Sequence, residues 1–416
     1  MALIRTSPMI QTGLVLLAAL FADATPSVAP AGTASVPAST ATEFSVDLGV
    51  APGKATSPET VNVKDFGAVG DGVTDDTKAF NSAYQYLSDV GGKIWVPKSL
   101  GCYMVTEIIR TSRVSLSGDG PASSCIESLP VHGVSRPLLS TAHAADPVTA
   151  ETIENLTLDG NRNAQSGISG DGRSVCIYLG GYRDTTLRNL VVKDCYTDGI
   201  YVTGSGPLLS VNGSGLLLDH VQVSNSRRNN VSIISGDNIT IKASSFNDAN
   251  GTAPQSGIDI EPNRVGQTTS NVFIGAGVVF SGNKGAGLSV FSSFQSQPSM
   301  NLVIDGAFIG NGGGVNIISG RPYEIGQIHV NGRFQGNGIG LAGVHDVVVG
   351  NVRVDLDGTA LYADRVSHME IGAGALLSGT TYDLYLTHDT TSIHLGSRRV
   401  LAHQSVGGFR GGLSGN

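Results

Sequence analysis

Residues Ser256–Arg264 read Ser-Gly-Ile-Asp-Ile-Glu-Pro-Asn-Arg. Apolar and acidic residues alternate in this stretch, and alternate residues of a β-strand face opposite sides. Ile258 and Ile260 are therefore expected to point into a core. Asp259 and Glu261 are expected to point outward together, with Cα atoms roughly 7 Å apart at about 3.3 Å per residue. The proline after Glu261 cannot donate to a ladder and is expected to end the strand.

Two acids on one outward strand face repel each other, which raises a carboxyl pKa. Acid–base enzymes use such pairs, because one group must hold a proton while the other accepts one. We therefore predict that Asp259 and Glu261 are catalytic. A solvated strand face, on which the acids have no chemical role, is the alternative.

Short strands of the same type recur along the chain between glycines and asparagines. The central apolar residues of six of them are separated by 23, 31, 27, 30 and 27 residues: Ile177, Ile200, Val231, Ile258, Leu288 and Val315. Second strands lie between them, and no stretch after residue 90 has a convincing helical period. This pattern predicts a solenoid of stacked coils with loops of variable length. A β-propeller, the rival fold, needs blades of about 40 or more residues.

Stacking these coils would align one outward-facing residue from each. The aligned column is expected to contain Tyr178, Tyr201, Ser232, Asp259, Ser289 and Asn316. Aromatic rings beside a carboxylate pair are typical of sugar-binding subsites, because rings pack against the apolar faces of pyranoses. Polar residues in the adjoining loops extend this hypothesis. The predicted substrate contacts are Tyr178, Asp198, Tyr201, Arg228, Asn263, Arg264 and Lys284.

The chain has 416 residues, of which 56 are glycine and only 14% are charged. A glycine-rich, charge-poor composition is typical of β-proteins with many turns. The net charge of −8 at pH 7 gives no basic footprint for nucleic acid. The predicted partner is a polysaccharide or oligosaccharide substrate, and the sequence leaves the oligomeric state open.

Composition divides the chain into four parts. Residues 1–24 have a basic start, a short apolar core and a small-x-small site, which is typical of a secretory signal. The apolar core is too short to span a membrane, so a secreted or periplasmic protein without a membrane span is predicted. Residues 25–60, rich in Ala, Pro, Ser and Thr, are expected to be a flexible linker. A catalytic β-helix domain is expected over residues 61–405, with less regular strands from about residue 320, and a glycine-rich tail over residues 406–416.

A helix is predicted at residues 75–90, before the first full coil. Thr74 or Asp75 is expected to cap its N-terminus, and the Gly-Gly pair at 91–92 to end it. Its apolar face is expected to comprise Ala79, Phe80, Ala83, Tyr84 and Leu87.

Three segments around this helix resemble a known family: NVKDFGAVGDGVTDDTKAF at 62–80, GGKIWVPKSLGCYMV at 91–105 and VSLSGDG at 114–120. They are similar to the N-terminal segment of the pectate lyase/rhamnogalacturonase-like superfamily, often called glycosyl hydrolase family 28-related. The resemblance covers about residues 61–128 and implies an all-β, single-stranded right-handed parallel β-helix. It does not specify a substrate, because hydrolases, lyases, epimerases and phage tailspikes share it. NLTLDGNRN at 155–163 is also similar to alginate C5-epimerase modules.

Glycoside hydrolysis is the preferred activity, because about 7 Å between the acids falls in the inverting range of roughly 6.5–9.5 Å. Glu261 as acid with Asp259 as base is one assignment, and the reverse is equally compatible. Family 28 polygalacturonases carry Asn-x-Asp, Asp-Asp and Gly-His-Gly on neighbouring coils. This chain has no Gly-His-Gly, and its only Asp-Asp lies at the predicted helix start. The resemblance therefore implies a shared fold rather than that site.

Two other functions stay open. A polysaccharide lyase or C5-epimerase acting on a uronate polymer needs a neutralised carboxylate and a base near C5. Arg228 and Arg264 are candidates for the first role, although they could also simply neutralise the acids. Tyr201 and Lys284 are candidates for the second, but the Asp-Pro-His motif of alginate epimerases is absent. A non-catalytic β-helix adhesin fits the secretory signal equally well.

The chain contains four cysteines, and export permits disulfides. Cys102 and Cys125 are 23 residues apart, about one coil, so a disulfide between them is predicted. Cys176 and Cys195, 19 residues apart, fit less well. None of the nine histidines has a metal-ligand spacing, so no metal site and no cofactor are predicted. The EF-hand pattern is absent, and the sequence leaves a calcium requirement open.

Overall fold

The structure is a computed structural model and describes residues 54–130, 132–141, 147–167, 174–206, 209, 211–292, 300–320, 325–387, 390–396, 404–405 and 414–415. The predicted signal peptide at 1–24, most of the linker at 25–60 and most of the tail at 406–416 lie outside these residues.

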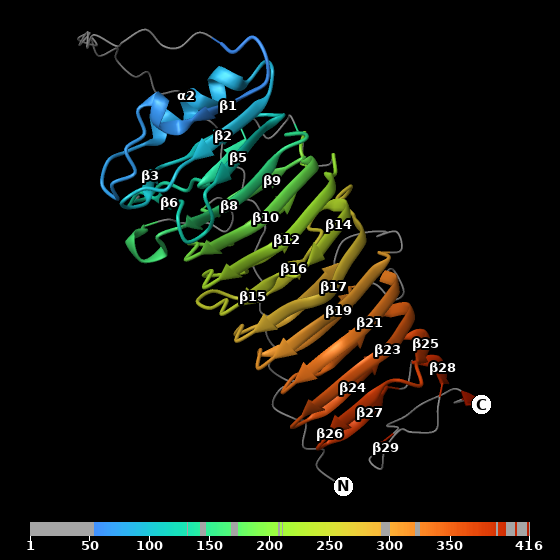
Figure 1. Cartoon of the computed structure of the whole chain (residues 1–416). Helices are drawn as coiled ribbons and strands as arrows, with labels where there is room; N and C mark the ends of the chain where they lie inside the picture. Colours follow the sequence, from blue (N-terminus) through green and yellow to red (C-terminus); the bar gives the residue numbers. More distant parts are fainter. Residues whose placement is uncertain are drawn as a thin grey trace, which may run out of the picture. The chain divides into compact units, whose positions relative to one another are not determined.

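The chain winds through two parallel sheets in turn, so that each strand pairs with its equivalent in the next coil (Figure 1). The first sheet, sheet A, has 18 strands: β1 (Glu59–Asn62), β2 (Gly92–Val96), β3 (Tyr103–Val105), β5 (Val114–Gly118), β6 (Cys125–Ser128), β8 (Thr152–Asp159), β10 (Arg183–Lys193), β12 (Ser214–Ser224), β14 (Gly236–Lys242), β15 (Ser245–Asn247), β17 (Thr269–Ser281), β19 (Leu302–Ile309), β21 (Ile325–Gln335), β23 (Val344–Leu356), β25 (Ser367–Ile371), β26 (Leu376–Gly379), β28 (Thr391–Leu395) and β30 (Ser414–Gly415).

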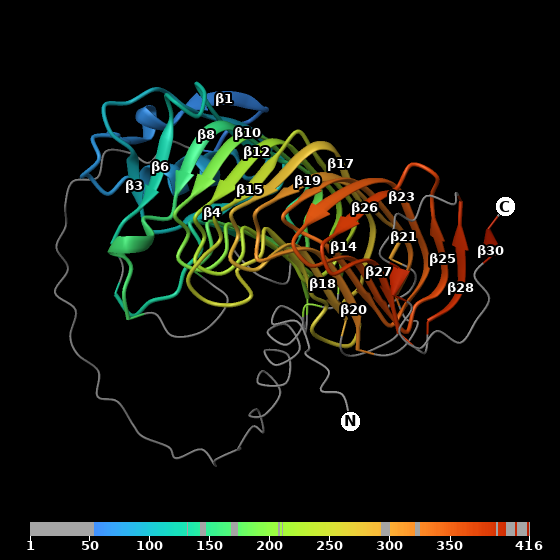
Figure 2. The same ribbon diagram turned by 90° about the horizontal axis from the view of Figure 1, so that it is seen from below.

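Sheet B has 12 shorter strands, one per coil: β4 (Ile108–Arg110), β7 (Leu139–Thr141), β9 (Ile177–Gly180), β11 (Ile200–Thr203), β13 (Val231–Ile233), β16 (Ile258–Ile260), β18 (Ala286–Ser292), β20 (Gly313–Ser319), β22 (Ile339–Ala342), β24 (Thr359–Asp364), β27 (Tyr382–Leu386) and β29 (Gln404–Ser405). Figure 2 shows the coils winding around one interior. The prediction of a single-stranded right-handed parallel β-helix is confirmed. After residue 320, β21 and β23 are strands of 11 and 13 residues, and their pairing shifts register between Val330 and Gly332.

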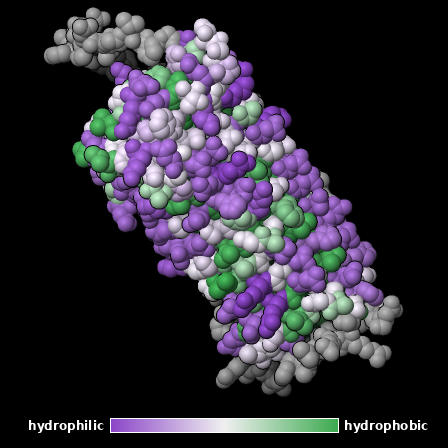
Figure 3. All heavy atoms as spheres, viewed as in Figure 1, coloured by the Kyte–Doolittle hydropathy of each residue, from purple (hydrophilic) through white to green (hydrophobic). Residues whose placement is uncertain are grey.

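The interior is filled by apolar side chains that stack from coil to coil. Four phenylalanines form one such row, with ring centroids 5.5, 4.6 and 4.7 Å apart: Phe246, Phe280, Phe308 and Phe334. On the face shown in Figure 3, hydrophilic residues predominate and apolar ones lie in small separate groups. Most apolar residues of each strand are therefore buried in the interior, because alternate side chains of a strand face opposite sides.

One corner of the coils is built from left-handed residues. Positions in register along sheet A all have φ between +47° and +81°: Gly91, Arg113, Ala150, Asp184, Gly215, Asn238, Asn271, Asn301, Gln327, Asp346, His368 and Ser392. Glycine reaches this region without strain, and Asn and Asp tolerate it better than most residues. The glycine, asparagine and aspartate residues at this corner therefore have a backbone cause.

The helix α2 (Thr77–Leu87) lies at the N-terminal end of the stack and is shorter than the predicted 75–90 (Figure 1). Its N-cap residue is Asp76 rather than Thr74 or Asp75. The Asp76 carboxylate instead accepts the N–H groups of Val69 and Gly70, at 2.7 and 3.1 Å. It fixes the turn before the helix, while Asp75 accepts the N–H of Thr77 at 2.9 Å.

A ladder of buried amides closes another corner. The Asn283 side chain donates to Oδ1 of Asn311 at 2.7 Å, and Asn311 donates to Oδ1 of Asn337 at 2.9 Å. Asn311 also donates to the carbonyl of Phe280 at 3.1 Å. Each amide therefore satisfies polar groups of its neighbours, which would otherwise be buried without partners.

Asn311→Ala is expected to lower the free energy of unfolding by at least about 2 kcal/mol, because it leaves more than one buried polar group without a partner. Urea unfolding followed by circular dichroism measures the change. Asn316→Ala is the matched control, since Asn316 is exposed on the adjacent β20, and it should change stability by no more than about 0.5 kcal/mol. Equal stabilities of the two variants would contradict a structural role for the ladder.

Candidate functional site

The predicted outward column lies in register on sheet B. A slip of one residue would turn the whole column inward, and the buried apolar residues on either side prevent it. The paired residues, in order along the stack, are Tyr178, Tyr201, Ser232, Asp259, Ser289 and Asn316. The composition of the column is therefore confirmed.

Asp259 lies on β16 between Ile258 and Ile260, both of which are buried in the core. Its side chain belongs to the outward column but is only 4% exposed, so the expectation of an exposed acid is wrong. Adjacent coils account for the burial. The Asn229 amide donates to Oδ2 of Asp259 at 3.2 Å, and Ser289 on the next coil also forms a hydrogen bond with the carboxylate.

Glu261 is the first residue after β16 and is half-buried. Its backbone N–H still donates to the carbonyl of Ile233 at 2.9 Å, which ties it to the preceding coil. The two acids therefore follow each other along one backbone held by the ladder on both sides. The charge of Glu261 acts on Asp259 and contributes to its raised pKa.

A third carboxylate lies beside the pair. Asp198 is fully buried before β11 and receives a bidentate contact from Arg228, with Nε donating to Oδ1 at 2.8 Å and Nη2 donating to Oδ2. The Ser232 hydroxyl donates to Oδ2 at 3.0 Å. Bidentate pairs of this kind fix orientation as well as charge. Asp198 and Arg228, both predicted as site residues, are thus brought together, and Arg228 acts on Asp259 and Glu261 through its charge.

Asn229 links these groups and was missed in the sequence. Its Nδ2 lies 3.1 Å from the Ser232 hydroxyl and 3.2 Å from the Asp259 carboxylate, while its Oδ1 accepts the N–H of Ser256 at 2.9 Å. These contacts therefore join its own coil to the next one. The only signal in the sequence is its position after Arg228 and before a strand, which does not identify a hydrogen-bond partner.

Burial changes the acidity of the pair. It raises the pKa of Asp259 to about 7, and the charge of Glu261 acts in the same direction. Burial also raises the pKa of Glu261, while the positive charge of Arg228 opposes this shift. A carboxyl group that titrates near neutral pH can hold a proton and release it during a reaction.

Tyr178 and Tyr201 stack on each other beside the acids. Their ring centroids are 5.9 Å apart and their planes differ by 9°. Since Tyr178 occupies one side of Tyr201, the other side faces the small Ser232 of the next coil. Burial raises the pKa of Tyr201 to about 12, so this phenol is protonated at neutral pH.

The remaining predicted contacts lie on loops around the site. Asn263 and Arg264 are exposed in the turn after Glu261, and Lys284 is exposed before β18. No hydrogen bond or ion pair joins any of these three side chains to the acids within the described part of the chain.

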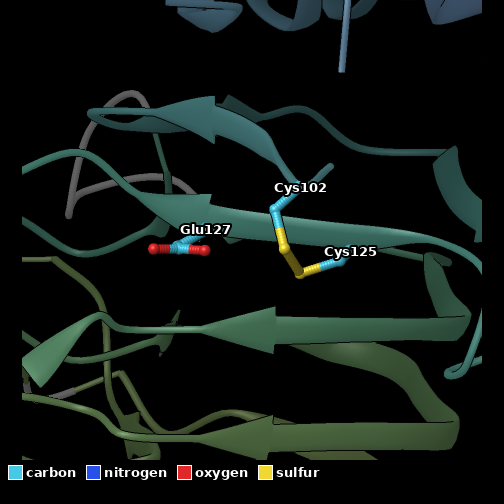
Figure 4. A group of neighbouring side chains, drawn as sticks. All are labelled: Cys102, Cys125 and Glu127. Carbon is cyan, nitrogen blue, oxygen red and sulfur yellow. A yellow bond between two sulfur atoms is a disulfide. The ribbon is translucent and has the colours of Figure 1, made fainter. Parts of the chain in front are cut away.

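The predicted disulfide between Cys102 and Cys125 is present and links adjacent coils (Figure 4). Cys176 and Cys195, which the spacing favoured less, are also joined. Glu127 lies near the first disulfide, and the three residues are the one close group of metal-ligand types among the described residues. With both sulfur atoms in the disulfide, this group offers a single carboxylate and no thiolate.

Asp259→Asn is expected to be more stable than the wild type at pH 8. The native pKa of about 7 lies above the unfolded value of about 3.9, so the native state binds the proton more tightly. This contribution is fully present below about pH 4 and is lost as the pH rises through 7. Thermal unfolding at pH 4 and pH 8 should show the stability difference only at the higher pH. The same difference at both values would exclude a raised pKa.

Among the described residues, no helix has the length and apolar character needed to span a membrane.

Comparison with known proteins extends these observations. The chain is 32% identical over 150 residues to the preneck appendage protein of Bacillus phage PZA, covering 35% of this chain and 17% of that protein. It is 29% identical over 282 residues to mannuronan C5-epimerase AlgE2 of Azotobacter vinelandii, covering 60% and 25%. The chain therefore matches only a small part of each of these relatives.

Among solved structures, the A-module of mannuronan C-5 epimerase AlgE6 from Azotobacter vinelandii superposes with a TM-score of 0.60 at 17% identity. The superposition covers 84% of this chain and 99% of the module, and at this identity it supports the fold alone. The sequence profile of the family described as rhamnogalacturonase A/epimerase, pectate lyase-like matches residues 60–278, more than half of the chain. That segment contains the capping helix, the first six strands of sheet B after it and both acids, and the chain belongs to this rhamnogalacturonase A/epimerase, pectate lyase-like family.

Proposed function

We propose that the protein is a secreted glycoside hydrolase in which Asp259 and Glu261 act as the acid–base pair on a polysaccharide or oligosaccharide. The observation that carries this proposal is a buried carboxyl group with a pKa of about 7 directly beside a second carboxyl group. The family includes carbohydrate-active proteins by its description, and the epimerase relatives act on a polysaccharide by theirs.

Asp259 is the better proton donor, because it is the more buried of the two and retains its proton near neutral pH. In the proposed step it protonates the glycosidic oxygen as the C–O bond breaks. Glu261, as the carboxylate, removes a proton from the water that attacks the anomeric carbon. The proton count balances, since one proton leaves Asp259 and one is taken up by Glu261. Asp198, held by Arg228, is connected to Asp259 through Ser232 and Asn229.

Substrate contacts are proposed around this pair. Tyr201 offers a ring face on the side of Ser232, and a pyranose can pack against such a face. Asn263, Arg264 and Lys284 are exposed where a bound chain would extend, and hydrogen bonds from these side chains would orient it. Tyr178 supports Tyr201 by stacking rather than by reaching the substrate.

The rate should depend on pH with a bell shape. Asp259 must be protonated, so kcat/KM falls as the pH rises through about 7. Glu261 must be ionised, so kcat/KM also falls at acidic pH. Measuring kcat/KM from pH 4 to pH 9 checks both limbs. A rate that keeps rising above pH 8 would exclude Asp259 as the acid.

A lyase or C5-epimerase on a uronate polymer is the second candidate, because the epimerase relatives match 60% of the chain. Two features favour hydrolysis. Two nitrogens of Arg228 already bind Asp198, so this guanidinium has less capacity for a uronate carboxylate. Tyr201, with a pKa of about 12, is a poor base at neutral pH.

A panel of purified polysaccharides separates the candidates by product. New reducing ends without ultraviolet absorbance support hydrolysis, whereas ends that carry an unsaturated-uronate absorbance indicate a lyase. A changed uronate composition by NMR without cleavage indicates an epimerase. Binding without any of these changes would indicate a β-helix adhesin and would overturn the proposed catalysis.

A further inference from the structure

A hollow lies on sheet A, over β21, β23, β25 and β28, whereas the acid pair lies on sheet B. Its volume is about 710 Å³, within the range of roughly 300–1,000 Å³ typical of small-molecule sites. We call it the C-terminal groove and define it by six lining residues: His329, Asp346, Val348, His368, Glu370 and His394.

The groove results from the register of the last coils. His329 pairs with Val348, Val348 with Glu370, and Glu370 with His394, so four residues from successive strands form one outward row. Asp346 lies in register with His368 in the parallel left-handed row two residues away. Imidazole and carboxylate groups separated by about 20 residues in the chain are thereby set side by side.

The carboxylate of Asp346 is held by imidazoles. Nδ1 of His345 lies 2.8 Å from its Oδ2, and Nδ1 of His368 lies 3.5 Å from its Oδ1. The side chains of His368 and Asp346 are 69% and 52% exposed, so both are accessible to a ligand in the groove. Carboxylates oriented in this way can accept hydrogen bonds from neighbouring hydroxyl groups of one ligand.

The charge of the groove limits the class of ligand. Its lining residues include two carboxylates and neither lysine nor arginine, so its formal charge is negative while the histidines are neutral. An anionic uronate chain would be repelled. No three of these imidazole and carboxylate atoms lie within 4.8 Å of one another among the described residues, so the groove is not a preformed metal site.

A neutral saccharide is a ligand class that agrees with the negative charge and the polar lining of the groove. Val348 is a half-buried apolar residue in the row, between His329 on one side and Glu370 on the other. An apolar side chain with polar groups on both sides suits a pyranose ring, which has C–H faces and a hydroxylated edge. We propose that the C-terminal groove is a second carbohydrate-binding site, specific for neutral saccharides and separate from the acid pair. It would hold the protein on a glycan surface and raise the local concentration of the bonds that the acid pair attacks.

Binding is tested on the full chain carrying Asp259→Asn, so that cleavage does not interfere. The probes are the hexasaccharides of cellulose, xylan, mannan and β-galactan, and polygalacturonate serves as the anionic probe. Isothermal titration is expected to give saturable binding of at least one neutral hexasaccharide. His329→Ala with Glu370→Ala should weaken that binding at least tenfold, because both side chains are exposed in ordinary strand conformations and can be removed without strain.

Asp355→Ala is the matched control, since Asp355 is an exposed acid on β23, the strand between β21 and β25, but lies outside the groove. It should leave the affinity unchanged, and all variants should show the circular dichroism spectrum of the parent. Two results would overturn the inference: no binding of any neutral hexasaccharide, or binding that the groove variant does not weaken. Groove-dependent binding of polygalacturonate alone would overturn the assigned ligand class. The experiment measures binding and not turnover, so its result can be interpreted even if the protein proves not to be a hydrolase.

Discussion

Asp259→Asn and Glu261→Gln are each expected to lower kcat by roughly two or more orders of magnitude on a glycan that the wild type cleaves, which is the usual loss when an acid–base group is removed. Both replacements are nearly isosteric. The Asn229 and Ser289 contacts around residue 259 can therefore be kept in part, and the ladder on either side of β16 holds the backbone. Initial rates at saturating substrate, with circular dichroism as a fold check, measure the effect.

Asp364→Asn is the control for these acids, because Asp364 ends a strand of the same sheet several coils away. It should retain wild-type turnover. Tyr201→Ala should differ from both groups by raising KM more than it lowers kcat, since its ring contacts substrate in the proposal. Near-normal turnover by both folded acid variants would refute the assignment and direct attention to Lys284 or to residues 227–229.

Glu151→Ala is expected to lower the free energy of unfolding by about 3–5 kcal/mol, the usual effect of stranding one charge of a buried ion pair. The side chains of Arg110 and Glu151 are both fully buried and form an ion pair. Arg110 also donates to the carbonyl of Tyr178 at 2.6 Å. The pair therefore connects β4 and β9 with the segment before β8, directly below α2. Urea unfolding at pH 7 measures the loss.

Two controls separate a stranded charge from a general packing defect. Replacing both partners, Arg110→Met with Glu151→Leu, should restore much of the stability, because no charge is left unpaired. Lys54→Ala removes an exposed ion pair with Asp89, whose side chains are 52% and 58% exposed, and should change stability by no more than about 1 kcal/mol. A double variant as unstable as Glu151→Ala would indicate that volume rather than charge dominates.

The repeat and the outward column could be predicted because both depend on local rules. Alternation within a strand sets which side chains face inward, and the spacing of Ile177, Ile200, Val231 and Ile258 sets the coil length. Because strands of successive coils are in register, the position of Asp259 within its strand was enough to predict which residues lie next to it on the two neighbouring coils. The disulfide between Cys102 and Cys125 followed from the same spacing.

The burial of Asp259 could not be predicted in this way. It depends on Asn229, about 30 residues earlier, and on Ser289, about 30 residues later, whose side chains close over the carboxylate. The pairing of Asp198 with Arg228 has the same origin, since the two are joined across a coil boundary. The C-terminal groove was missed because His329, Glu370 and His394 have no regular spacing and meet only through the register of the late strands.

The coil-by-coil ladder also determines how the protein would respond to a pulling force. Each coil contacts its neighbours along the stack, so tension on the C-terminal end is expected to peel off one coil at a time. A coil of about 27 residues would release roughly 90 Å of chain at about 3.4 Å per residue. Both disulfides lie in the first half of the chain, and each closes a loop of about one coil. In the oxidised protein, the C-terminal coils would thus extend fully and in steps. The N-terminal coils would extend less, because the disulfides keep the residues between each pair of cysteines from extending.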